Sequence, residues 1–206
     1  MIDRHRGECQ RNEGLRINAF RDDAMANVFI CPIEGEAAKA HYRTAVETGV
    51  ELETVLPWIR DEVQIADLKR YYPDGRCYVW GVPDRGDNRS TWNAMSENDL
   101  VLGYRNRSIV SAATVLMKVD SPSLATALWG NHAEGPSRLM SFFNKPHVGE
   151  VPIVEQMSGY LDREFSGFTR LSPEKCDNIL WAFGSLEIFV RLGLRYDFPF
   201  NFRHSE

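Results

Sequence analysis

Two tryptophans flank an irregular loop in the middle of the chain, in the segment CYVWGVPDRGDNRSTWNAMSENDLVLGYRNRSI (Cys77–Ile109). Trp80 ends a predicted strand, and Trp92 follows the Gly/Pro/Asp-containing loop Val82–Arg89, with several arginines nearby. Aromatic side chains stack on the flat faces of bases, and polar loop groups bond to base edges. The segment therefore predicts a pocket for a flat, polar ligand such as a nucleic acid base.

Nine side chains are candidates for contacting such a ligand, and core packing or a solvated loop is the competing interpretation for each of them. The candidates are Trp80, Asn88, Arg89, Ser90, Trp92, Tyr104, Trp129, Ser141 and Phe142. Four basic residues suit phosphate contacts, with solvated turn charges as the alternative: Arg105, Arg107, Arg138 and Lys145. Phe168, which follows Gly167, is expected to pack at the end of the sheet.

Catalytic motifs are absent from the sequence. The histidines at positions 5, 41, 132, 147 and 204 lack metal-ligand spacing, and there is no GxSxG or Gly-rich phosphate loop. Asn131-His132 lacks the second histidine and cysteine pairs of an HNH nuclease. The acids at 84, 87 and 99 lack a nuclease-type partner on a strand, so they are interpreted as solvated loop acids and a turn carboxylate. We therefore expect no enzyme activity, metal or cofactor; the alternative is a nuclease or hydrolase with an unrecognised site.

The elements that must position these side chains follow from apolar periodicity, capping residues and turn residues. Strands are predicted at 27–33, 76–82, 99–104, 107–118, 138–144 and 147–154, and helices at 36–47, 120–129, 174–183 and 185–192, with weaker helical pieces at 52–59 and 63–68. Arg105-Asn106 is the predicted bend of a hairpin, and Trp92 is placed on a short turn. This order predicts an α+β fold with a mostly antiparallel, barrel-like sheet.

At 206 residues the chain fits one domain with terminal extensions. Residues 1–24 have few apolar side chains and are predicted to be a disordered or non-native lead-in, 25–198 the domain, and 199–206 a tail. The charged N-terminus is unlike a signal peptide, and no segment reaches the roughly 18 apolar residues of a membrane span. A cytoplasmic location without a membrane partner is therefore expected. The cysteines at 9, 31, 77 and 176 form no CxxC pair and are interpreted as buried or idle thiols.

The net charge of −5 is unusual for a protein that binds DNA mainly by neutralising phosphates. Residues 1–75 carry 14 acids and 10 lysines or arginines, a net of −4, whereas residues 76–206 carry 15 and 14, a net of −1. The second part is the more balanced one, but composition does not show a positive face there.

Several short motifs occur in a characteristic order: Tyr78–Gly81, Arg89–Trp92, Asn98–Tyr104, Leu128–Gly130, Leu139–Phe143, Gly167–Leu171 and Phe183–Leu186. Together they span roughly residues 76–192, with 28–33 as a first strand. In this order and spacing the chain resembles the EVE-like domains of the PUA-like superfamily, found in modification-dependent restriction endonucleases and related to YTH domains. Gly135-Pro136-Ser137 departs from the Trp-Pro pair that relatives often carry, and no nuclease or ATPase domain is recognisable.

The resemblance implies a small, mostly antiparallel β-barrel flanked by helices, which flips a modified base into an aromatic cage. Our hypothesis is a non-enzymatic reader of methylated or hydroxymethylated cytosine, or methyladenine, in DNA. Its setting would be restriction or another defence, with modified DNA as the partner and a separate nuclease or ATPase as the effector. The alternatives are a PUA-like module for modified RNA or tRNA, and an adaptor whose pocket binds a peptide.

Overall fold

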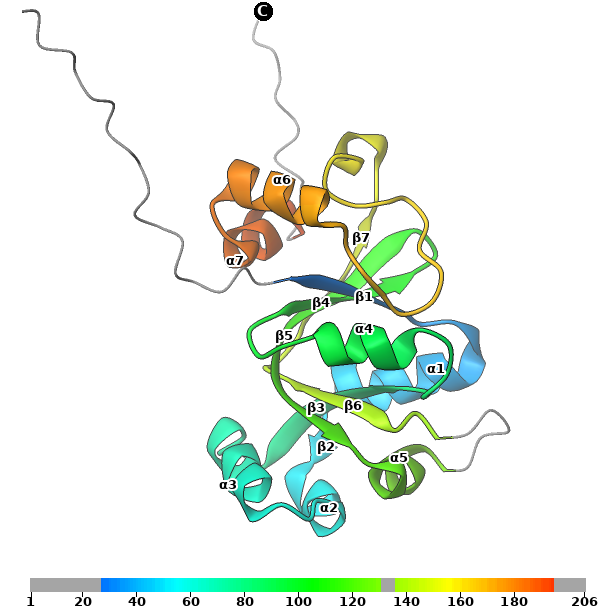
Figure 1. The fold of residues 1–206 in the computed structure, drawn as a ribbon, viewed down its shortest axis with the longest axis vertical. Helices are drawn as coiled ribbons and strands as arrows, with labels where there is room; N and C mark the ends of the chain where they lie inside the picture. Colours follow the sequence, from blue (N-terminus) through cyan, green and yellow to red (C-terminus); the bar gives the residue numbers. More distant parts are fainter. Residues whose placement is uncertain (1–26, 131–135, 195–206) are drawn as a thin grey trace, which may run out of the picture.

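The fold is organised around one long strand, β5 (Ser108–Asp120) (Figure 1). The computed structural model describes residues 27–130 and 136–194; the predicted lead-in, residues 1–24, and the predicted tail, 199–206, lie outside them. Strand β5 pairs antiparallel with β4 (Leu100–Arg105), β6 (Leu139–Phe143) and β7 (His147–Pro152). Register shifts in all three pairings let β5 bend, so that its first half pairs with β7 and its second half with β6.

The remaining strands extend this sheet on both sides. Strand β3 (Arg76–Val82) pairs with β6 and with β2 (Val50–Glu51), while β1 (Val28–Pro32) lies parallel to β4 and antiparallel to β8 (Thr169–Arg170). The order is β2-β3-β6-β5-β4-β1-β8, with β7 beside β5. The predicted mixed α+β fold with a mostly antiparallel sheet is confirmed. Within the described residues no pairing joins β2 to β8, so the predicted barrel-like sheet is an open path of strands.

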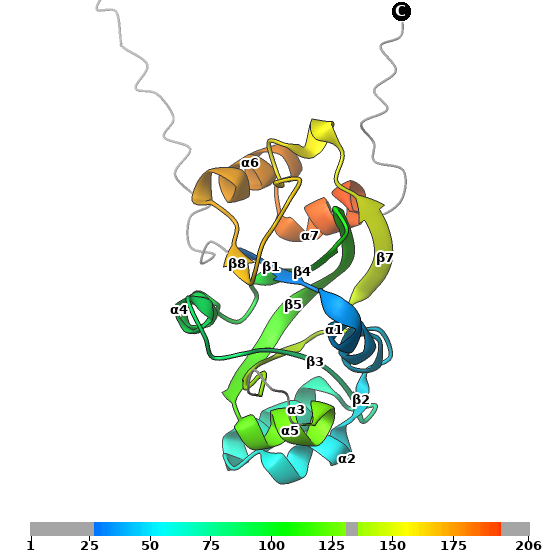
Figure 2. The ribbon, with the colours of Figure 1, turned by 90° about the vertical axis from the view of Figure 1, so that its right-hand side faces the viewer.

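Helices lie at both ends of the sheet and along its sides (Figures 1 and 2). The helical elements are α1 (Gly35–Tyr42) with the π-helical turn η1 (Arg43–Glu47), α2 (Leu52–Val55), η2 (Leu56–Trp58), α3 (Glu62–Tyr71), α4 (Asn88–Ala94), α5 (Pro122–Trp129), η3 (Glu155–Met157), α6 (Pro173–Phe183), α7 (Leu186–Ile188) and η4 (Phe189–Gly193). Helices α2, α3 and α5 gather at one end, and α6 and α7 at the other. None of the helices in the described part of the chain has the length and apolar character needed to span a bilayer.

Strand β1 separates the two largest apolar clusters. Phe29 packs with the cluster that includes Val79 and Phe142, whereas its neighbour Ile30 packs with the cluster that includes Leu102. Successive side chains of a strand point to opposite faces, so both faces of β1 are covered. This burial holds the carboxyl end of β1 in place, next to the site described below.

Local sequence signals placed several elements correctly. Strand β3 has the predicted bounds. Ser121 and Ser172 accept hydrogen bonds from backbone N–H groups in the first turns of α5 and α6, as their capping positions predict. The predicted bend at Arg105-Asn106 is wrong by one residue, because Asn106 and Arg107 carry the positive φ angles of 50° and 62° that a tight hairpin turn requires.

Helix α4 corrects the prediction that Trp92 lies on a short turn. The segment Asn88–Ala94 forms two turns of α-helix, with Trp92 buried on its inner face. The glycine and proline nearby belong to the loop before the helix and do not interrupt it. A helix at this point turns Trp92 toward the sheet instead of toward the loop.

Candidate functional site

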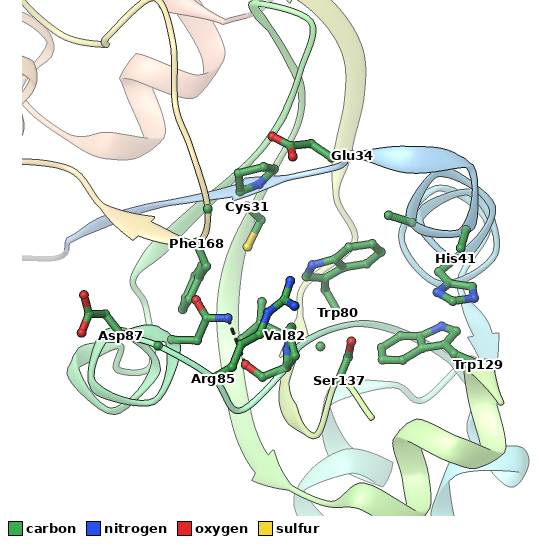
Figure 3. Close-up of a pocket in the computed structure, with 18 residues that line it drawn as sticks. Cys31, Glu34, His41, Trp80, Val82, Arg85, Asp87, Trp129, Ser137 and Phe168 are labelled. Carbon is green, nitrogen blue, oxygen red and sulfur yellow. Dashed lines mark hydrogen bonds between the residues drawn. The ribbon is translucent and has the colours of Figure 1, made fainter. Parts of the chain in front are cut away.

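An open pocket of about 740 Å³ lies where β1, β3 and α1 come together (Figure 3). The end of β1 and the start of α1 form one side, and the end of β3 with the loop 82–88 forms another. Trp129 from α5, Ser137 before β6 and Phe168 before β8 complete the lining. Five separate stretches of the chain therefore meet at this pocket.

Aromatic rings form opposing walls of the pocket. Figure 3 shows Trp80 and Phe168 on opposite sides of the space, and both side chains are half-buried. Trp80 is held by Tyr42, whose ring meets it edge-on at 6.3 Å, and by Trp129 at 6.0 Å. His41 stacks on the ring of Trp129 at 5.6 Å. These contacts fix the indole of Trp80 while leaving part of its surface exposed to the pocket.

The floor beneath Trp80 depends on Gly81. A Cβ atom added at Gly81 would lie 2.1 Å from the backbone oxygen of Ser137 and 2.7 Å from the ring of Trp129. Gly81 pairs with Met140 across β3 and β6, and the sulfur of Met140 would lie 2.8 Å from that Cβ. The missing side chain therefore allows three lining elements to approach each other closely.

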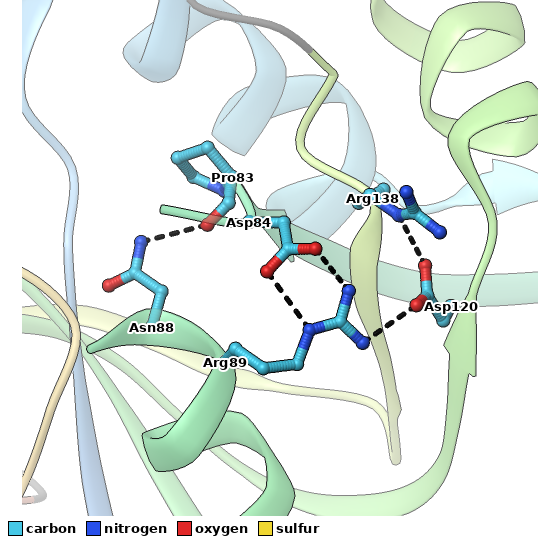
Figure 4. Close-up of polar contacts among 6 residues, drawn as sticks. All are labelled: Pro83, Asp84, Asn88, Arg89, Asp120 and Arg138. Carbon is cyan, nitrogen blue, oxygen red and sulfur yellow. Dashed lines mark hydrogen bonds and ion pairs between the residues drawn. The ribbon is translucent and has the colours of Figure 1, made fainter. Parts of the chain in front are cut away.

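The polar lining consists mainly of groups from the loop 82–88 and from the start of α1. Glu34, Arg85 and Asp87 are exposed at the pocket, and Asn88 is half-buried. The Asn88 amide donates a hydrogen bond of 2.9 Å from Nδ2 to the backbone oxygen of Pro83 (Figure 4). The pocket thus combines flat apolar walls with hydrogen-bonding groups on two of its sides.

Cys31 also lines the pocket, and its chemistry is limited by burial. Desolvation raises the pKa of this thiol to about 12, so it stays protonated at neutral pH and is a poor nucleophile. The described cysteines, Cys31, Cys77 and Cys176, are buried and free, which confirms the prediction for these three; Cys9 lies outside the described residues.

A chain of ion pairs braces the loop 82–88 from outside the pocket (Figure 4). Arg89 binds both carboxylate oxygens of Asp84, with one contact at 2.9 Å, and its Nη1 lies 2.7 Å from Asp120 at the end of β5. Asp120 also accepts from Arg138, at 2.5 Å, one residue after the pocket residue Ser137. Two lining segments, the loop and the approach to β6, are therefore connected through Asp120.

These ion pairs, called the brace below, favour the charged forms of Asp84, Arg89 and Asp120. The hydrogen bond from Arg89 lowers the pKa of Asp84, and hydrogen bonds to Asp84 and Asp120 raise the pKa of Arg89. For Asp120, partial burial alone would raise the pKa, but hydrogen bonds from Arg138 and Arg89 outweigh it and the pKa is lowered. The pairs are exposed to solvent, which screens them, so their main consequence is geometric.

Replacing Arg89 with methionine is expected to change the midpoint of thermal unfolding at pH 7 by no more than a few degrees, because solvent screens the ion pairs that it removes. Both aspartates have lowered folded-state pKa values, so the pairs stabilise the fold above the ordinary aspartate pKa of about 3.8, and this stabilisation disappears as the pH falls through the folded values. Thermal unfolding of both proteins from pH 7 to pH 2.5 checks this. Arg191→Met, at an exposed pair with Glu187, is the control. A difference between wild type and Arg89→Met that grows toward low pH would contradict the assignment.

The chain is similar in fold, but not recognisably in sequence, to a known protein. No model of a known protein family matches the chain, and no curated protein is similar to it in sequence. A solved structure of the N-terminal domain of Thermococcus gammatolerans McrB bound to m5C DNA is similar in fold, with a TM-score of 0.57 and 16% sequence identity. The likeness covers 76% of this chain and 96% of that domain. The two chains share a fold.

Among the nine predicted base contacts, Trp80, Asn88 and Trp129 line the pocket. Trp92 and Ser141 do not: both are buried behind the wall, where Trp92 Nε1 donates to Ser141 Oγ at 3.2 Å. Lys118 covers the ring of Trp92 with its ammonium at 4.6 Å from the ring centre. Phe142 is completely buried in the core.

Three further candidates lie away from the lining. Tyr104 is buried in the cluster around β4, where its hydroxyl donates to the backbone oxygen of Arg163 at 3.2 Å. Ser90 donates back to the oxygen of Asp87 at 2.8 Å, as a residue in the first turn of a helix often does, and Arg89 belongs to the brace. In the structure these three side chains therefore make contacts within the protein, outside the pocket lining.

The four predicted phosphate contacts are surface residues outside the pocket lining. Arg105 lies 3.7 Å from Glu150, Arg107 pairs with Glu164, and Arg138 belongs to the brace. Lys145 follows β6, at the opposite end of that strand from Ser137. Their positions are compatible with contacts to a backbone that passes over the surface, but they do not converge on the pocket.

Phe168 has a second role besides the packing role that the sequence predicts. It contacts Phe29 with ring centres 6.0 Å apart, as packing at the end of the sheet predicts, and it also forms the wall opposite Trp80. Arg85 and Asp87 belong to the predicted loop, and the Gly/Pro/Asp composition of that loop is the sequence signal that points to them. No sequence signal points to Cys31, Glu34 or His41 as pocket residues, because the parallel pairing of β1 with β4 brings them here.

In the described ranges 27–130 and 136–194, no group of three His, Cys, Asp or Glu side chains could hold a metal ion. Asp99 is buried and accepts hydrogen bonds from the backbone N–H groups of Asn27 and Ser96, so it closes a turn. Asp84 is engaged by Arg89. The Asn131-His132 pair lies outside the described residues.

Proposed function

We propose that the pocket binds a modified base that is flipped out of DNA, and that the protein is a non-enzymatic reader of that base. The observation that carries the proposal is the pair of opposing rings, Trp80 and Phe168, with hydrogen-bonding groups of the loop 82–88 between them. The similar fold of a domain bound to m5C DNA supports it. Trp80, Trp129 and Phe168 would form the aromatic cage, and Asn88 would contact the base edge.

The size of the pocket and the expected energies are compatible with a nucleoside. Small-molecule sites commonly enclose roughly 300–1,000 Å³, and this one measures about 740 Å³. Flipping a base costs a few kcal/mol, and stacking on one aromatic ring returns about 1–3 kcal/mol. Burying a methyl group adds roughly 0.8 kcal/mol. Two aromatic walls and a methyl contact would offset the cost of flipping.

The charge of the chain favours recognition through the pocket over general attraction to phosphates. A net charge of −5 opposes approach to DNA, and Arg105, Arg107 and Arg138 are each paired with an acid. We assign these three arginines and Lys145 as secondary phosphate contacts. Few neutralised phosphates mean that binding should depend only weakly on salt.

We place this activity in restriction or another defence against foreign DNA, with a separate nuclease or ATPase as the effector. We also assign the sheet to the PUA-like class of small β-barrels. The bend of β5, which connects two halves of the sheet, and the fold likeness support that assignment. The wider biological setting rests on the proposed base recognition.

Fluorescence anisotropy at near-physiological salt tests the proposal. The panel consists of short duplexes carrying unmodified bases, 5-methylcytosine, 5-hydroxymethylcytosine or N6-methyladenine, each with an RNA equivalent. A preference of tenfold or more for one modified DNA supports the reader and identifies its base. A preference for modified RNA would replace it with the RNA-binding alternative, and uniformly weak binding would overturn both.

A further inference from the structure

The orientation of one side-chain amide in the pocket has a chemical consequence for the ligand. Asn88 Nδ2 donates to the backbone oxygen of Pro83 at 2.9 Å, within the loop that leads into α4. Rotating the amide by 180° would place Oδ1 against that oxygen, two acceptors with no proton between them. The oxygen of Asn88 is therefore held on the side away from Pro83 (Figure 4).

Two other lining residues carry carboxylates. Asp87 precedes Asn88, and Glu34 lies on the side formed by β1 and the start of α1. Ionised carboxylates only accept hydrogen bonds. Arg85 supplies donors as well: its side chain is exposed, and Figure 3 shows it between Trp80 and Phe168. The lining therefore offers both kinds of partner, and the orientation of Asn88 decides which kind stands at its own position.

We propose, resting on the function proposed above, that Asn88 makes the pocket select bases that carry an exocyclic amino group over bases with a carbonyl oxygen at that position. Cytosine presents the N4 amino group and adenine the N6 amino group, whereas thymine presents O4. An amino group donates to the fixed Oδ1 of Asn88. A carbonyl oxygen there leaves two acceptors facing each other, and a site with unpaired polar groups rejects its ligand strongly.

This selection solves a problem that the aromatic walls cannot solve. 5-Methylcytosine and thymine carry the same methyl group at C5 and have nearly the same stacking surface. Stacking on Trp80 and Phe168, or burial of the methyl group, therefore treats the two bases alike. A reader of methylated cytosine must distinguish them at positions 3 and 4 of the ring. At position 4 an acceptor favours cytosine, and in this proposal Asn88 Oδ1 is that acceptor.

Matched pairs of duplexes test the inference. The probes carry 5-methylcytosine or thymine opposite guanine, and 5-hydroxymethylcytosine or 5-hydroxymethyluracil opposite guanine; for a methyladenine ligand the pair is N6-methyladenine and 6-methoxypurine. A mismatched base flips more easily, so the T·G probe is biased toward tighter binding. The wild type is nevertheless expected to favour the amino-bearing base at least tenfold. Asn88→Ala is expected to reduce this ratio below about threefold.

Asn93→Ala is the matched control, since Asn93 lies on the same helix, is exposed and is outside the lining. Its ratio should equal that of the wild type, and near-ultraviolet circular dichroism verifies that each variant is folded. Full discrimination retained by folded Asn88→Ala would overturn this inference while leaving the reader function intact. Failure of the wild type to bind any modified probe would instead overturn the proposed function itself.

Discussion

Replacing Trp80 with leucine is expected to weaken binding of the preferred modified duplex by at least about fivefold. Trp80 offers one of the two opposing aromatic surfaces, and loss of one stacking ring costs about 1–3 kcal/mol, or roughly 5- to 150-fold in affinity. Leucine keeps apolar volume against Tyr42 and Trp129, so the variant tests the flat face of the ring more than the packing beneath it. Anisotropy titrations with the best duplex of the panel measure the effect.

Two further variants make this result interpretable. Trp80→Phe keeps an aromatic face and should retain most of the affinity. Trp181→Leu carries the same change on α6, where the side chain is 91% exposed and outside the pocket lining, and should bind like the wild type. Urea denaturation gives the folded fraction of each variant, to which affinities are normalised. Equal affinities of folded Trp80→Leu and wild type would show that Trp80 is not a cage wall.

Replacing Gly81 with alanine is expected to produce the largest loss of stability among single methyl additions in the pocket. The new Cβ would lie 2.1 Å from the backbone oxygen of Ser137, so a strand would have to move. Overpacking of this kind costs roughly 2–3 kcal/mol, which lowers the thermal midpoint by about 5–10 °C in a chain of this size. Ligand affinity should fall too, because the displaced segment carries Ser137 and lies against Trp129.

Gly149→Ala is the matched control for Gly81→Ala. Gly149 also lies in a strand, and a Cβ added there meets no atom within 4 Å. Its thermal midpoint should stay within a few degrees of that of the wild type. Differential scanning fluorimetry compares the two variants directly. Equal midpoints for the two variants would show that position 81 tolerates a Cβ atom despite the close approach of β3 to the segment before β6.

The elements that depend on neighbouring residues were predictable. Arg76–Val82 forms a strand because β-branched and aromatic residues follow a Pro-Asp-Gly turn, and Ser121 and Ser172 cap helices by bonds to residues three positions on. These signals are local, so they survive in any tertiary context. The two-residue strands β2 and β8 carry no such signal, because a strand that short is defined by its partner.

The candidate site was predictable only where it coincides with one continuous segment. Trp80, Asn88 and the loop 82–88 could be found from the tryptophan and Gly/Pro/Asp pattern. Trp92 shares that pattern but is turned inward by α4, where a buried hydrogen bond to Ser141 holds it. An aromatic residue on a helix looks the same in sequence whether its face meets the core or a ligand.

The sequence by itself determined the α+β class, the order of the six longer strands along the chain, and the loop that carries polar groups of the pocket. The tertiary structure alone decided which ring faces Trp80, because Phe168 reaches the pocket only when β8 pairs with β1. It also decided that Arg89 and Arg138 are held by Asp84 and Asp120. Both outcomes depend on distances between residues far apart in the chain, and such distances are set by how the strands pair and pack.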